Sequence, residues 1–302
     1  MSRKRWTIQE ILDVTTELLR QRGIDSSRLC SEVLLSHQLK RTRIQLYLEF
    51  DQPLSEQEIA RYRSLIKRRL RREPLQYITG HQEFWSLDFL VSPAVLVPRA
   101  ETEILVEQAI KLKETDLLPD STGGRPRILD LGTGCGAIAV SLAKEIEEVA
   151  LWASDISSEA LAMARENARQ HGVSERIEFR CGDLWQPFMH LPLSFDMIIS
   201  NPPYIPAETF HTLPPEVRTY EPRIALDGHE NGMHFIERII RGGGTYLKPG
   251  GWLLIEMDPD QTERAMELID ATQCFRYRER LMDYHKRYRV VMAQAKHGKD
   301  RY

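Results

Sequence analysis

The sequence predicts an α/β protein preceded by a small helical bundle, and three observations support this prediction. From residue 127 onward, short apolar and β-branched runs alternate with helical patterns, which is typical of a parallel sheet covered by helices on both faces. Polar residues follow the ends of the predicted strands, the edge at which such sheets bind ligands. Residues 1–74, by contrast, show helical periodicity only.

The N-terminal stretch predicts a bundle of short helices over residues 1–73. Thr7 is an expected N-cap with Glu10 as its capping-box partner, and the pair Ser55 and Glu58 repeats this pattern. The stretch contains no set of residues that would be catalytic. Its helices are expected to begin after Thr7, at Ser26 or Ser27, at Arg43 and after Ser55.

A β-hairpin linker is predicted over residues 74–95. Pro74 ends the bundle, and the runs Leu75–Gly80 and Phe84–Val91 that follow it are rich in aromatic and β-branched residues. A helix over 104–113 and a loop over 117–126 are expected next.

The predicted α/β domain occupies residues 96–302, and its pattern alternates as a doubly wound sheet requires. Its strands are expected at 127–131, 150–154, 176–181, 196–200, 251–257, 275–279 and 288–293. Its helices are expected at 137–146, 158–171, 233–242 and 261–271.

A glycine-rich turn joins the first of these strands to a helix. Gly132, Gly134 and Gly136 let the backbone approach a ligand closely, and Thr133 and Cys135 lie between them. The same spacing also fits the relaxed dinucleotide fingerprint. The turn alone therefore predicts a cofactor site without identifying the cofactor.

Two carboxylates follow the next two predicted strands. Asp155 could take both hydroxyls of a ribose, or it could simply cap the helix that begins near Ser158. Asp183 could accept the exocyclic amine of adenine while Leu184 packs on the ring, with helix capping again as the alternative. Because each of these residues follows the carboxyl end of a predicted strand, together they predict a nucleoside-containing ligand that lies across the strand ends.

The fourth strand ends in Asn201-Pro-Pro-Tyr204, where the chain must turn. The prolines lack N–H donors and force extended backbone, so the carbonyl of Pro202 can face a ligand. Asn201 adds a side-chain acceptor, Pro203 continues the turn, and Tyr204 offers an aromatic face. Together they predict a slot for a planar group with an NH2, although a proline-rich loop ending a buried strand is the plainer interpretation.

Composition indicates an ordinary globular protein: 42% of its 302 residues are hydrophobic and 28% are charged. It has no apolar run near the roughly 20 residues that span a membrane and no apolar stretch of a secretory signal, so we expect a cytoplasmic protein without membrane contact. Its four cysteines have neither metal-ligand nor redox spacing, which argues against zinc and predicts no metal site.

The net charge of −3 is unevenly distributed. Residues 1–75 hold 16 Lys and Arg against 10 Asp and Glu, so the remainder is acidic. The densest basic run, Arg61–Arg72, could follow RNA phosphates or dock on an acidic protein surface. Because apolar residues interleave at helical spacing, a solvated helix face is the more ordinary interpretation.

The chain resembles the protein-glutamine N5-methyltransferases of the HemK type, which modify peptide chain release factors. The resemblance covers nearly the whole chain. It rests on the segments 74–80, Val97–Glu103, Asp130–Gly136, Asp155–Ala160, Asn167-Ala168 and Asn201–Ile205, together with Phe84. The sequence departs from the family pattern at His229, at Asp258 and over residues 283–289.

This resemblance implies a class I methyltransferase sheet of seven strands, the last antiparallel, that uses S-adenosylmethionine. The expected substrate is the glutamine of the Gly-Gly-Gln motif in release factors 1 and 2, which the N-terminal bundle would recognise. Asn201 and the Pro202 carbonyl would accept the two amide N–H bonds, and Tyr204 would pack on the amide plane. The enzyme is expected to be a monomer.

Three alternatives to this function remain open. An adenine amine of DNA or RNA fits the same slot, but such a substrate predicts a basic catalytic half, and here that half is acidic. A related subgroup methylates a glutamine in a ribosomal protein. A non-catalytic or dinucleotide-binding domain would leave the segment from Asn201 to Tyr204 unexplained.

Overall fold

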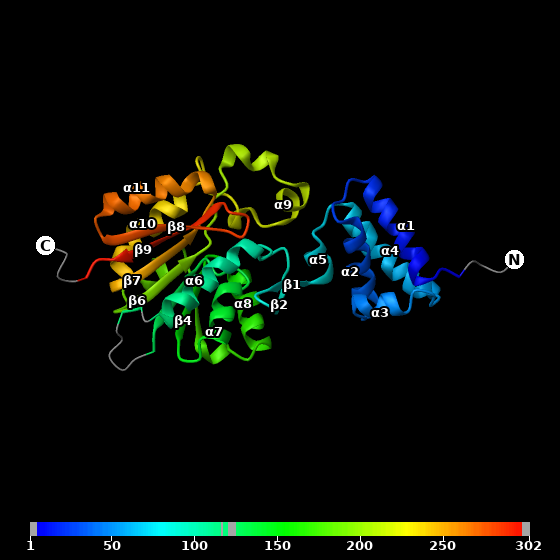
Figure 1. The fold of residues 1–302 in the computed structure, drawn as a ribbon, viewed down its shortest axis with the longest axis horizontal. Helices are drawn as coiled ribbons and strands as arrows, with labels where there is room; N and C mark the ends of the chain where they lie inside the picture. The colour runs from blue at the N-terminus through cyan, green and yellow to red at the C-terminus, as the bar shows by residue number, and fades with distance from the viewer. Residues whose placement is uncertain (1–4, 116, 120–124, 298–302) are drawn as a thin grey trace. The chain divides into compact units, whose positions relative to one another are not determined.

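The computed structural model describes residues 5–115, 117–119 and 125–297, and the chain divides into two compact units (Figure 1). The first unit comprises Met1–His81 and Pro214–Tyr220, and the second comprises Gln82–Leu213 and Glu221–Tyr302. The chain therefore passes between the units three times.

The first unit is a helical bundle around an apolar core. The capping boxes predicted at Thr7 and Ser55 are confirmed, and a third starts the helix after Thr42. The core includes Leu12, Leu34 and Tyr62, none of which is more than 1% exposed. The helices are α1 (Ile8–Gln21), α2 (Ser27–Leu39), α3 (Arg43–Leu48), α4 (Glu56–Leu70), α5 (Leu75–Thr79) and α9 (Pro215–Tyr220).

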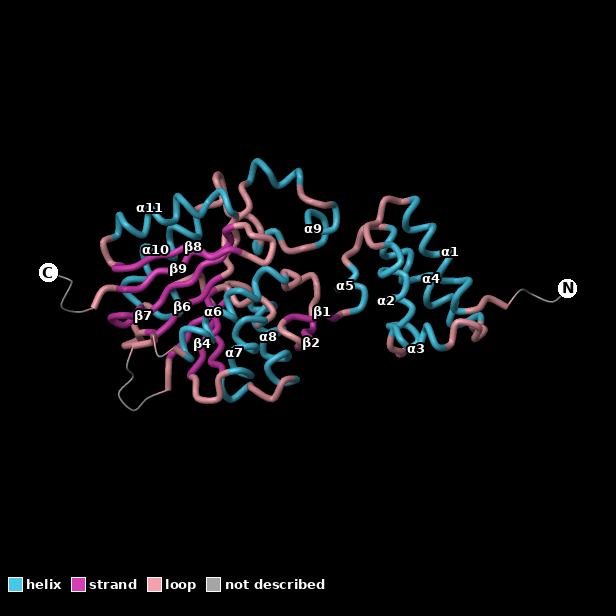
Figure 2. The backbone as a smooth tube through the Cα atoms, viewed as in Figure 1, coloured by secondary structure: helices cyan, strands magenta, loops and turns pink. Residues whose placement is uncertain are grey.

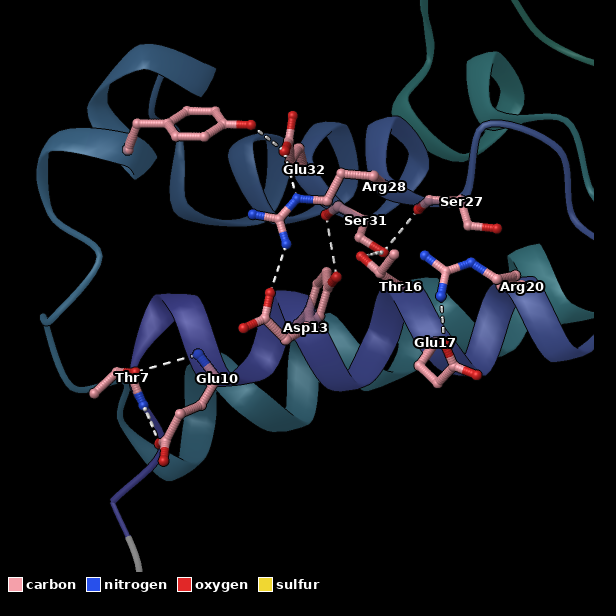
Figure 3. Close-up of polar contacts among 12 residues, drawn as sticks. Thr7, Glu10, Asp13, Thr16, Glu17, Arg20, Ser27, Arg28, Ser31 and Glu32 are labelled. Carbon is pink, nitrogen blue, oxygen red and sulfur yellow. Dashed lines mark hydrogen bonds and ion pairs between the residues drawn. The ribbon is translucent and has the colours of Figure 1, made fainter.

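A buried carboxylate holds α1, α2 and α3 together. Arg28 on α2 donates to Asp13 on α1 and to Glu32 on its own helix, each at 2.7 Å (Figure 3). Arg43 and Tyr47 on α3 also donate to Glu32. Burial acts to raise the pKa of Glu32, but these hydrogen bonds outweigh it and hold the pKa below its usual value.

The basic run on α4 is partly structural. Arg69 is buried and forms an ion pair with Glu216 on α9 at 3.0 Å, and Arg72 reaches the same carboxylate at 3.4 Å. Arg68 pairs with Glu73. These three cations therefore stabilise the bundle itself.

The prediction of strand structure over Leu75–Gly80 is wrong, because these residues form α5. Pro74 precedes the helix, and Gly80 closes it with a φ of 81°, which is the usual proline-first, glycine-last pattern of a short helix. The aromatic and β-branched residues that suggested a strand, Tyr77 and Ile78, are instead buried.

The predicted hairpin forms further along, as β1 (His81–Phe84) and β2 (Leu87–Leu90). Trp85 and Ser86 form its turn with φ of 52° and 55°. Asn167 fixes β2 by accepting from the Leu90 N–H at 2.8 Å and donating to its carbonyl at 3.0 Å. The same side chain also donates to the Cys135 carbonyl at 2.9 Å, which links the hairpin to the glycine-rich turn.

The second unit contains the predicted seven-stranded sheet, and its order is β5-β4-β3-β6-β7-β9-β8. The first five strands of this order are parallel, and β9 runs antiparallel to both of its neighbours. The strands are β3 (Arg127–Leu131), β4 (Ala150–Asp155), β5 (Ile177–Cys181), β6 (Phe195–Ser200), β7 (Leu247–Glu256), β8 (Phe275–Met282) and β9 (Tyr288–Ala295).

Successive parallel strands proceed outward from β3 to β4 and β5, and the next strand, β6, pairs with the other side of β3, so the β3–β6 boundary is the switch point of the sheet. Figure 2 shows the strands of this sheet in magenta with helices packed beside them. Alternate residues of the central strands, such as Leu129 and Leu253, pack against α10 and α11. The helices of this unit are α6 (Glu103–Glu114), α7 (Ala137–Glu145), α8 (Ser158–Gln170), α10 (His234–Tyr246) and α11 (Thr262–Thr272).

Residues 120–124, half of the predicted loop over 117–126, lie outside the described residues. Within the described part of the chain, no helix combines the length and apolar character that a membrane crossing requires.

Candidate active site

A pocket of about 380 Å³ lies at the carboxyl ends of the parallel strands in the second unit. It is bounded by the turn after β3 and by the residues that follow β4, β5 and β6, as the doubly wound topology requires. The structure brings most of the predicted site residues into its wall: Gly132, Thr133, Gly134, Cys135, Asp155, Asp183, Leu184, Asn201 and Pro203. Gly136, Pro202 and Tyr204 are not part of this wall.

The glycine-rich turn has the left-handed backbone that its sequence suggests. Gly132 and Gly134 have φ of 82° and 55°, and the space beside each is open. Gly136 instead begins α7, where an added Cβ would lie 3.1 Å from the Cβ of Ala164 on α8. This third glycine therefore permits helix packing rather than ligand contact.

The carboxylate of Asp130, near the end of β3, stabilises this turn through two hydrogen bonds. It is fully buried, and its Oδ2 accepts from the Thr133 hydroxyl at 2.6 Å and from the Ala139 N–H at 3.2 Å. Burial raises the pKa of Asp130 to about 7. Asp130 was not predicted as a site residue, although its position two residues before Gly132 was a signal in the sequence.

Asp155 ends β4 with its carboxylate in the pocket wall. Its Oδ2 accepts from the Gly134 N–H and its Oδ1 from the Ser157 N–H, each at 2.9 Å. The alternative that it caps α8 is wrong, because Ser157 is the N-cap of that helix. Burial raises the pKa of Asp155, and each of its oxygens keeps a lone pair for a further donor.

Asp183 is half exposed at the pocket and already has one partner. Its Oδ2 accepts from Arg238 on α10 at 2.6 Å, so one carboxylate oxygen is committed within the protein. Leu184 next to it has a φ of 43°, a conformation rare for a leucine. Leu184 lines the pocket, and its packing on an adenine ring stays a prediction.

Asn201 reaches the pocket with one end of its amide fixed. Its Nδ2 donates to the Thr102 hydroxyl at 3.0 Å, and no described residue donates to its Oδ1. Pro202 is buried, and its carbonyl accepts no hydrogen bond from the described residues. Two neighbouring acceptors are therefore unused.

Tyr204 lies beside the pocket rather than in its wall. Its hydroxyl donates to the Glu256 Oε1 at 3.3 Å, and its carbonyl accepts from Gln261 at 2.8 Å. Burial raises the pKa of its phenol well above the usual value. Glu256 was not predicted as a site residue, because nothing near it in the sequence marks the end of β7 as special.

A third carboxylate that was not predicted, Glu221, supports the pocket residue Arg99. Glu221 is buried and accepts from the Val97 N–H at 3.2 Å and from Arg99 at 2.6 Å. Arg99 itself lines the pocket. The sequence separation of more than 120 residues explains why no local pattern could reveal this pair.

The departures from the family pattern have local structural roles. His229 lines the pocket with a φ of 63°, the left-handed region that favours a glycine. Asp258 forms a capping box with Gln261. Asp283 accepts from the His285 and Arg287 N–H groups and shapes the turn before β9.

The described residues hold no group of three or more His, Cys, Asp or Glu side chains placed to bind a metal ion.

Comparison with known proteins gives two family models and many relatives. Residues 10–80 match the model of the PrmC N-terminal domain, and residues 113–212 match that of the methyltransferase small domain. The release factor glutamine methyltransferase of Geobacter sulfurreducens is 42% identical over 273 residues, which is 89% of this chain and 92% of that protein. The enzyme of the same name from Moorella thermoacetica is 39% identical over 287 residues, covering 95% and 98%.

Among solved structures, the hMettl16 catalytic domain in complex with an RNA hairpin of the MAT2A 3′UTR aligns with a TM-score of 0.56 at 15% identity. The alignment covers 81% of this chain and 82% of that one, and it shows a shared methyltransferase fold. Sequence similarity over nearly the full length is the more specific finding. The chain belongs to the release factor glutamine methyltransferase family.

Proposed function

We propose that this protein transfers a methyl group from S-adenosylmethionine to the side-chain amide nitrogen (N5) of a glutamine in peptide chain release factors. One observation carries the proposal: Thr102 holds the Nδ2 of Asn201, so the Asn201 Oδ1 and the Pro202 carbonyl remain as two adjacent acceptors. A primary amide has two N–H donors on one nitrogen, which this pair can bind.

The residues of the pocket fit the cofactor. The backbone at Gly132 and Gly134 leaves open space for close approach, and the Asp155 carboxylate has spare lone pairs for the two ribose hydroxyls. Leu184 supplies an apolar surface for the adenine, and Asp183 keeps one carboxylate oxygen for its amine. When bound, S-adenosylmethionine supplies an electrophilic methyl group on a sulfonium.

Positioning accounts for most of the proposed mechanism. An amide nitrogen is a weak nucleophile because its lone pair is delocalised into the carbonyl. Asn201 and Pro202 would aim this nitrogen at the methyl carbon and stabilise the positive charge that develops on it. The transfer would replace the C–S bond of the bound cofactor by a C–N bond, and the proton that the nitrogen loses would pass to solvent. Alignment of this kind is worth roughly 7 to 11 kcal/mol.

The remaining assignments follow from family membership. Residues 1–73 serve as the domain that recognises the release factor, residues 74–95 as the linker, and residues 96–302 as the methyltransferase domain. The modified residue is the glutamine of the Gly-Gly-Gln motif in release factors 1 and 2, and the enzyme acts as a cytoplasmic monomer. Support comes from the match of residues 10–80 to a domain that the family shares.

An adenine amine in nucleic acid is the second candidate, because it presents the same two N–H donors to Asn201 and Pro202. A flipped base needs an aromatic face to stack on. Tyr204 was expected to supply that face, and its hydroxyl is held by Glu256 outside the pocket wall. The acidic balance of residues 76–302 is the observation that favours a protein substrate over nucleic acid.

Mass spectrometry of a purified release factor, incubated with this protein and S-adenosylmethionine, tests the proposal. We expect the gain of one methyl group on the Gly-Gly-Gln glutamine. Parallel reactions contain duplex or single-stranded nucleic acid, and a ribosomal protein. Methylation of adenine alone, or of the ribosomal protein alone, would contradict the proposal.

A further inference from the structure

Arg99 is the only lysine or arginine among the described residues that line the pocket. The carboxylates in the same wall, Asp155 and Asp183, lie at or just after the ends of β4 and β5. A cation in the wall of a cleft raises the local concentration of anionic groups. The position of Arg99 therefore indicates that part of the bound ligand is negatively charged.

Glu221 holds this cation from within the protein. Its Oε1 accepts from the Arg99 Nη2 at 2.6 Å, and its Oε2 accepts from the Val97 N–H at 3.2 Å. The side chain of Glu221 is 2% exposed, whereas that of Arg99 is 35% exposed. One end of the ion pair is thus fixed in the interior, and the other end reaches the pocket.

The guanidinium of Arg99 has more donors than Glu221 uses. It carries five N–H groups, and the ion pair engages only Nη2. No described residue accepts a hydrogen bond from its Nε or Nη1. These donors remain for a ligand, and a carboxylate would accept them in strong, charge-assisted hydrogen bonds.

The backbone places Arg99 at the end of the pocket where methyl transfer is proposed. Its carbonyl accepts from the Thr102 N–H at 3.1 Å, so both residues belong to one turn of the chain. The Thr102 hydroxyl accepts from the Asn201 Nδ2 at 3.0 Å. The cation is therefore joined by a single turn to the residue that would receive the substrate amide.

The proposed ligands contain only one anionic group. The glutamine amide, the ribose and the adenine are neutral, and the sulfonium and the amine of S-adenosylmethionine are positive. Its remaining charged group is the carboxylate of the methionine part, which shares the sulfur with the transferred methyl group. The amino-acid part must therefore lie at the same end of the pocket as Asn201 and Arg99.

We propose that Arg99 binds the carboxylate of S-adenosylmethionine and that Glu221 is the positioning residue that holds the Arg99 guanidinium at the pocket. The inference rests on the proposed function for the identity of the cofactor. Binding can be measured without any release factor.

Glu221 also joins two segments of the pocket wall. Pro98 directly follows Val97, Pro222 directly follows Glu221, and both prolines line the pocket. A role limited to this packing would affect every ligand of the pocket alike. The experiment therefore has to separate the carboxylate from the rest of the cofactor.

Calorimetry of the full-length protein with S-adenosylmethionine and with its decarboxylated form, which lacks only the carboxylate, makes this separation. The wild type should bind the intact cofactor about 10- to 100-fold more tightly, the usual value of hydrogen bonds between charged groups. Affinity for the decarboxylated form reports on the rest of the pocket, so it also shows that each variant is folded.

The double variant Arg99→Met with Glu221→Gln removes both charges, whereas Arg99→Met alone would leave a buried carboxylate unpaired. It should bind the two ligands with affinities within about threefold of each other, because no cation remains to distinguish them. Its affinity for the decarboxylated form should be no weaker than that of the wild type.

Glu221→Gln keeps Arg99 but removes the charge that holds it. The preference for the intact cofactor should fall by about tenfold, as when a partner that orients a binding residue is lost, while the affinity for the decarboxylated form stays unchanged. The matched control, Arg169→Met with Glu166→Gln, removes an exposed ion pair of α8 and should keep the wild-type preference.

A wild-type preference in the double variant would show that other donors hold the carboxylate, and it would overturn the inference even if the release factor is methylated. Equal weakening of both ligands in Glu221→Gln would contradict the positioning role. Loss of the preference in both variants, in a protein that methylates no release factor, would support the inference and contradict the proposed substrate alone.

Discussion

The side-chain amide of Asn201 is the group on which the proposed chemistry depends most directly. We expect Asn201→Ala to bind S-adenosylmethionine nearly as the wild type does and to lose about 10² to 10³ in turnover, the effect of removing one preorganised polar group at a reacting centre. Calorimetry and single-turnover assays separate the two quantities. Turnover within a few-fold of the wild type would remove Asn201 from the mechanism.

Asp130 makes folding stability depend on pH. Its pKa is about 7 in the folded protein against a usual 3.8, so the native state binds more protons than the unfolded state between these values. This contribution to the free energy of unfolding therefore falls as pH rises from about 4 to about 7. Glu256, whose pKa is also raised to about 7, adds a loss of the same sign.

Asp130→Asn should flatten this dependence, because an uncharged amide can still accept from Thr133 and Ala139. Urea unfolding at pH 5 and pH 8 measures the change. Glu178→Gln, on the exposed edge of β5, is the control and should keep the wild-type slope. A variant with an unchanged slope would exclude Asp130 as a source of the effect.

Sequence reasoning identified the residues whose neighbours in the chain explain them. Asp155, Asp183 and Asn201 each follow an apolar strand, and parallel strands bring their carboxyl ends to one edge, so their convergence was predictable. Thr102 and Glu256 were not predictable, because their contacts join residues 99 and 52 positions apart in the chain. Side-chain chemistry is local information, whereas hydrogen-bond partners depend on the completed fold.

Among the elements, α10 shows how packing overrides local signals. Its predicted end near residue 242 reflects Gly242, Gly243 and Gly244, yet the helix continues to Tyr246. An added Cβ at Gly242 would lie 2.0 Å from Trp185, whose ring stacks on Tyr246 and donates to the Arg238 carbonyl. These glycines admit a neighbouring side chain rather than end the helix.

Gly242→Ala should therefore destabilise the protein by about 1 to 3 kcal/mol, the usual cost of overpacking, even though alanine favours a helix by up to about 1 kcal/mol. Urea unfolding measures the free energy of unfolding. As a control, Ser64→Ala changes an exposed position on α4 and should alter stability by less than about 0.5 kcal/mol. A stabilised Gly242→Ala would mean that Trp185 moves aside freely.

The same reasoning explains the error at α5. Aromatic and β-branched residues favour strands because they fit a half-buried surface, and a short helix packed against a core offers a similar surface. The flanking Pro74 and Gly80 were the better guide. The capping boxes were predicted correctly because they depend on residues three positions apart.

At the scale of the molecule, the charge on α4 provides a test of substrate docking. Once Arg68, Arg69 and Arg72 are committed within the bundle, Arg61, Arg63 and Lys67 remain exposed. Reversing these three charges to Glu should raise KM for the intact release factor by about tenfold at low salt, because long-range attraction is lost. KM for a short Gly-Gly-Gln peptide should not change.

The matched control reverses Lys111 and Lys144, two exposed cations of the second unit. It should leave both KM values near those of the wild type. An unchanged KM for the intact factor in the α4 variant would identify this face as a solvated surface only.

The order of elements could be predicted from sequence, because strands and helices alternate with clear periods. The membership of α9 in the N-terminal unit could not, since a helix of six residues more than 140 positions away carries no signal of its partner. Its contacts are the Glu216 carboxylate on Arg69 and the Tyr220 hydroxyl on the Arg71 carbonyl. Only a completed chain brings them together.

This discontinuity determines the order in which the protein can fold during its own synthesis. The first 81 residues leave the ribosome well before Pro214–Tyr220, and at typical translation rates the interval is roughly 7 to 28 s. Throughout it, Arg69 lacks the carboxylate that neutralises it in the finished protein. The nascent bundle therefore lacks α9 during this interval. Ribosome pausing before residue 220 would lengthen the time for which the incomplete bundle is exposed to proteases.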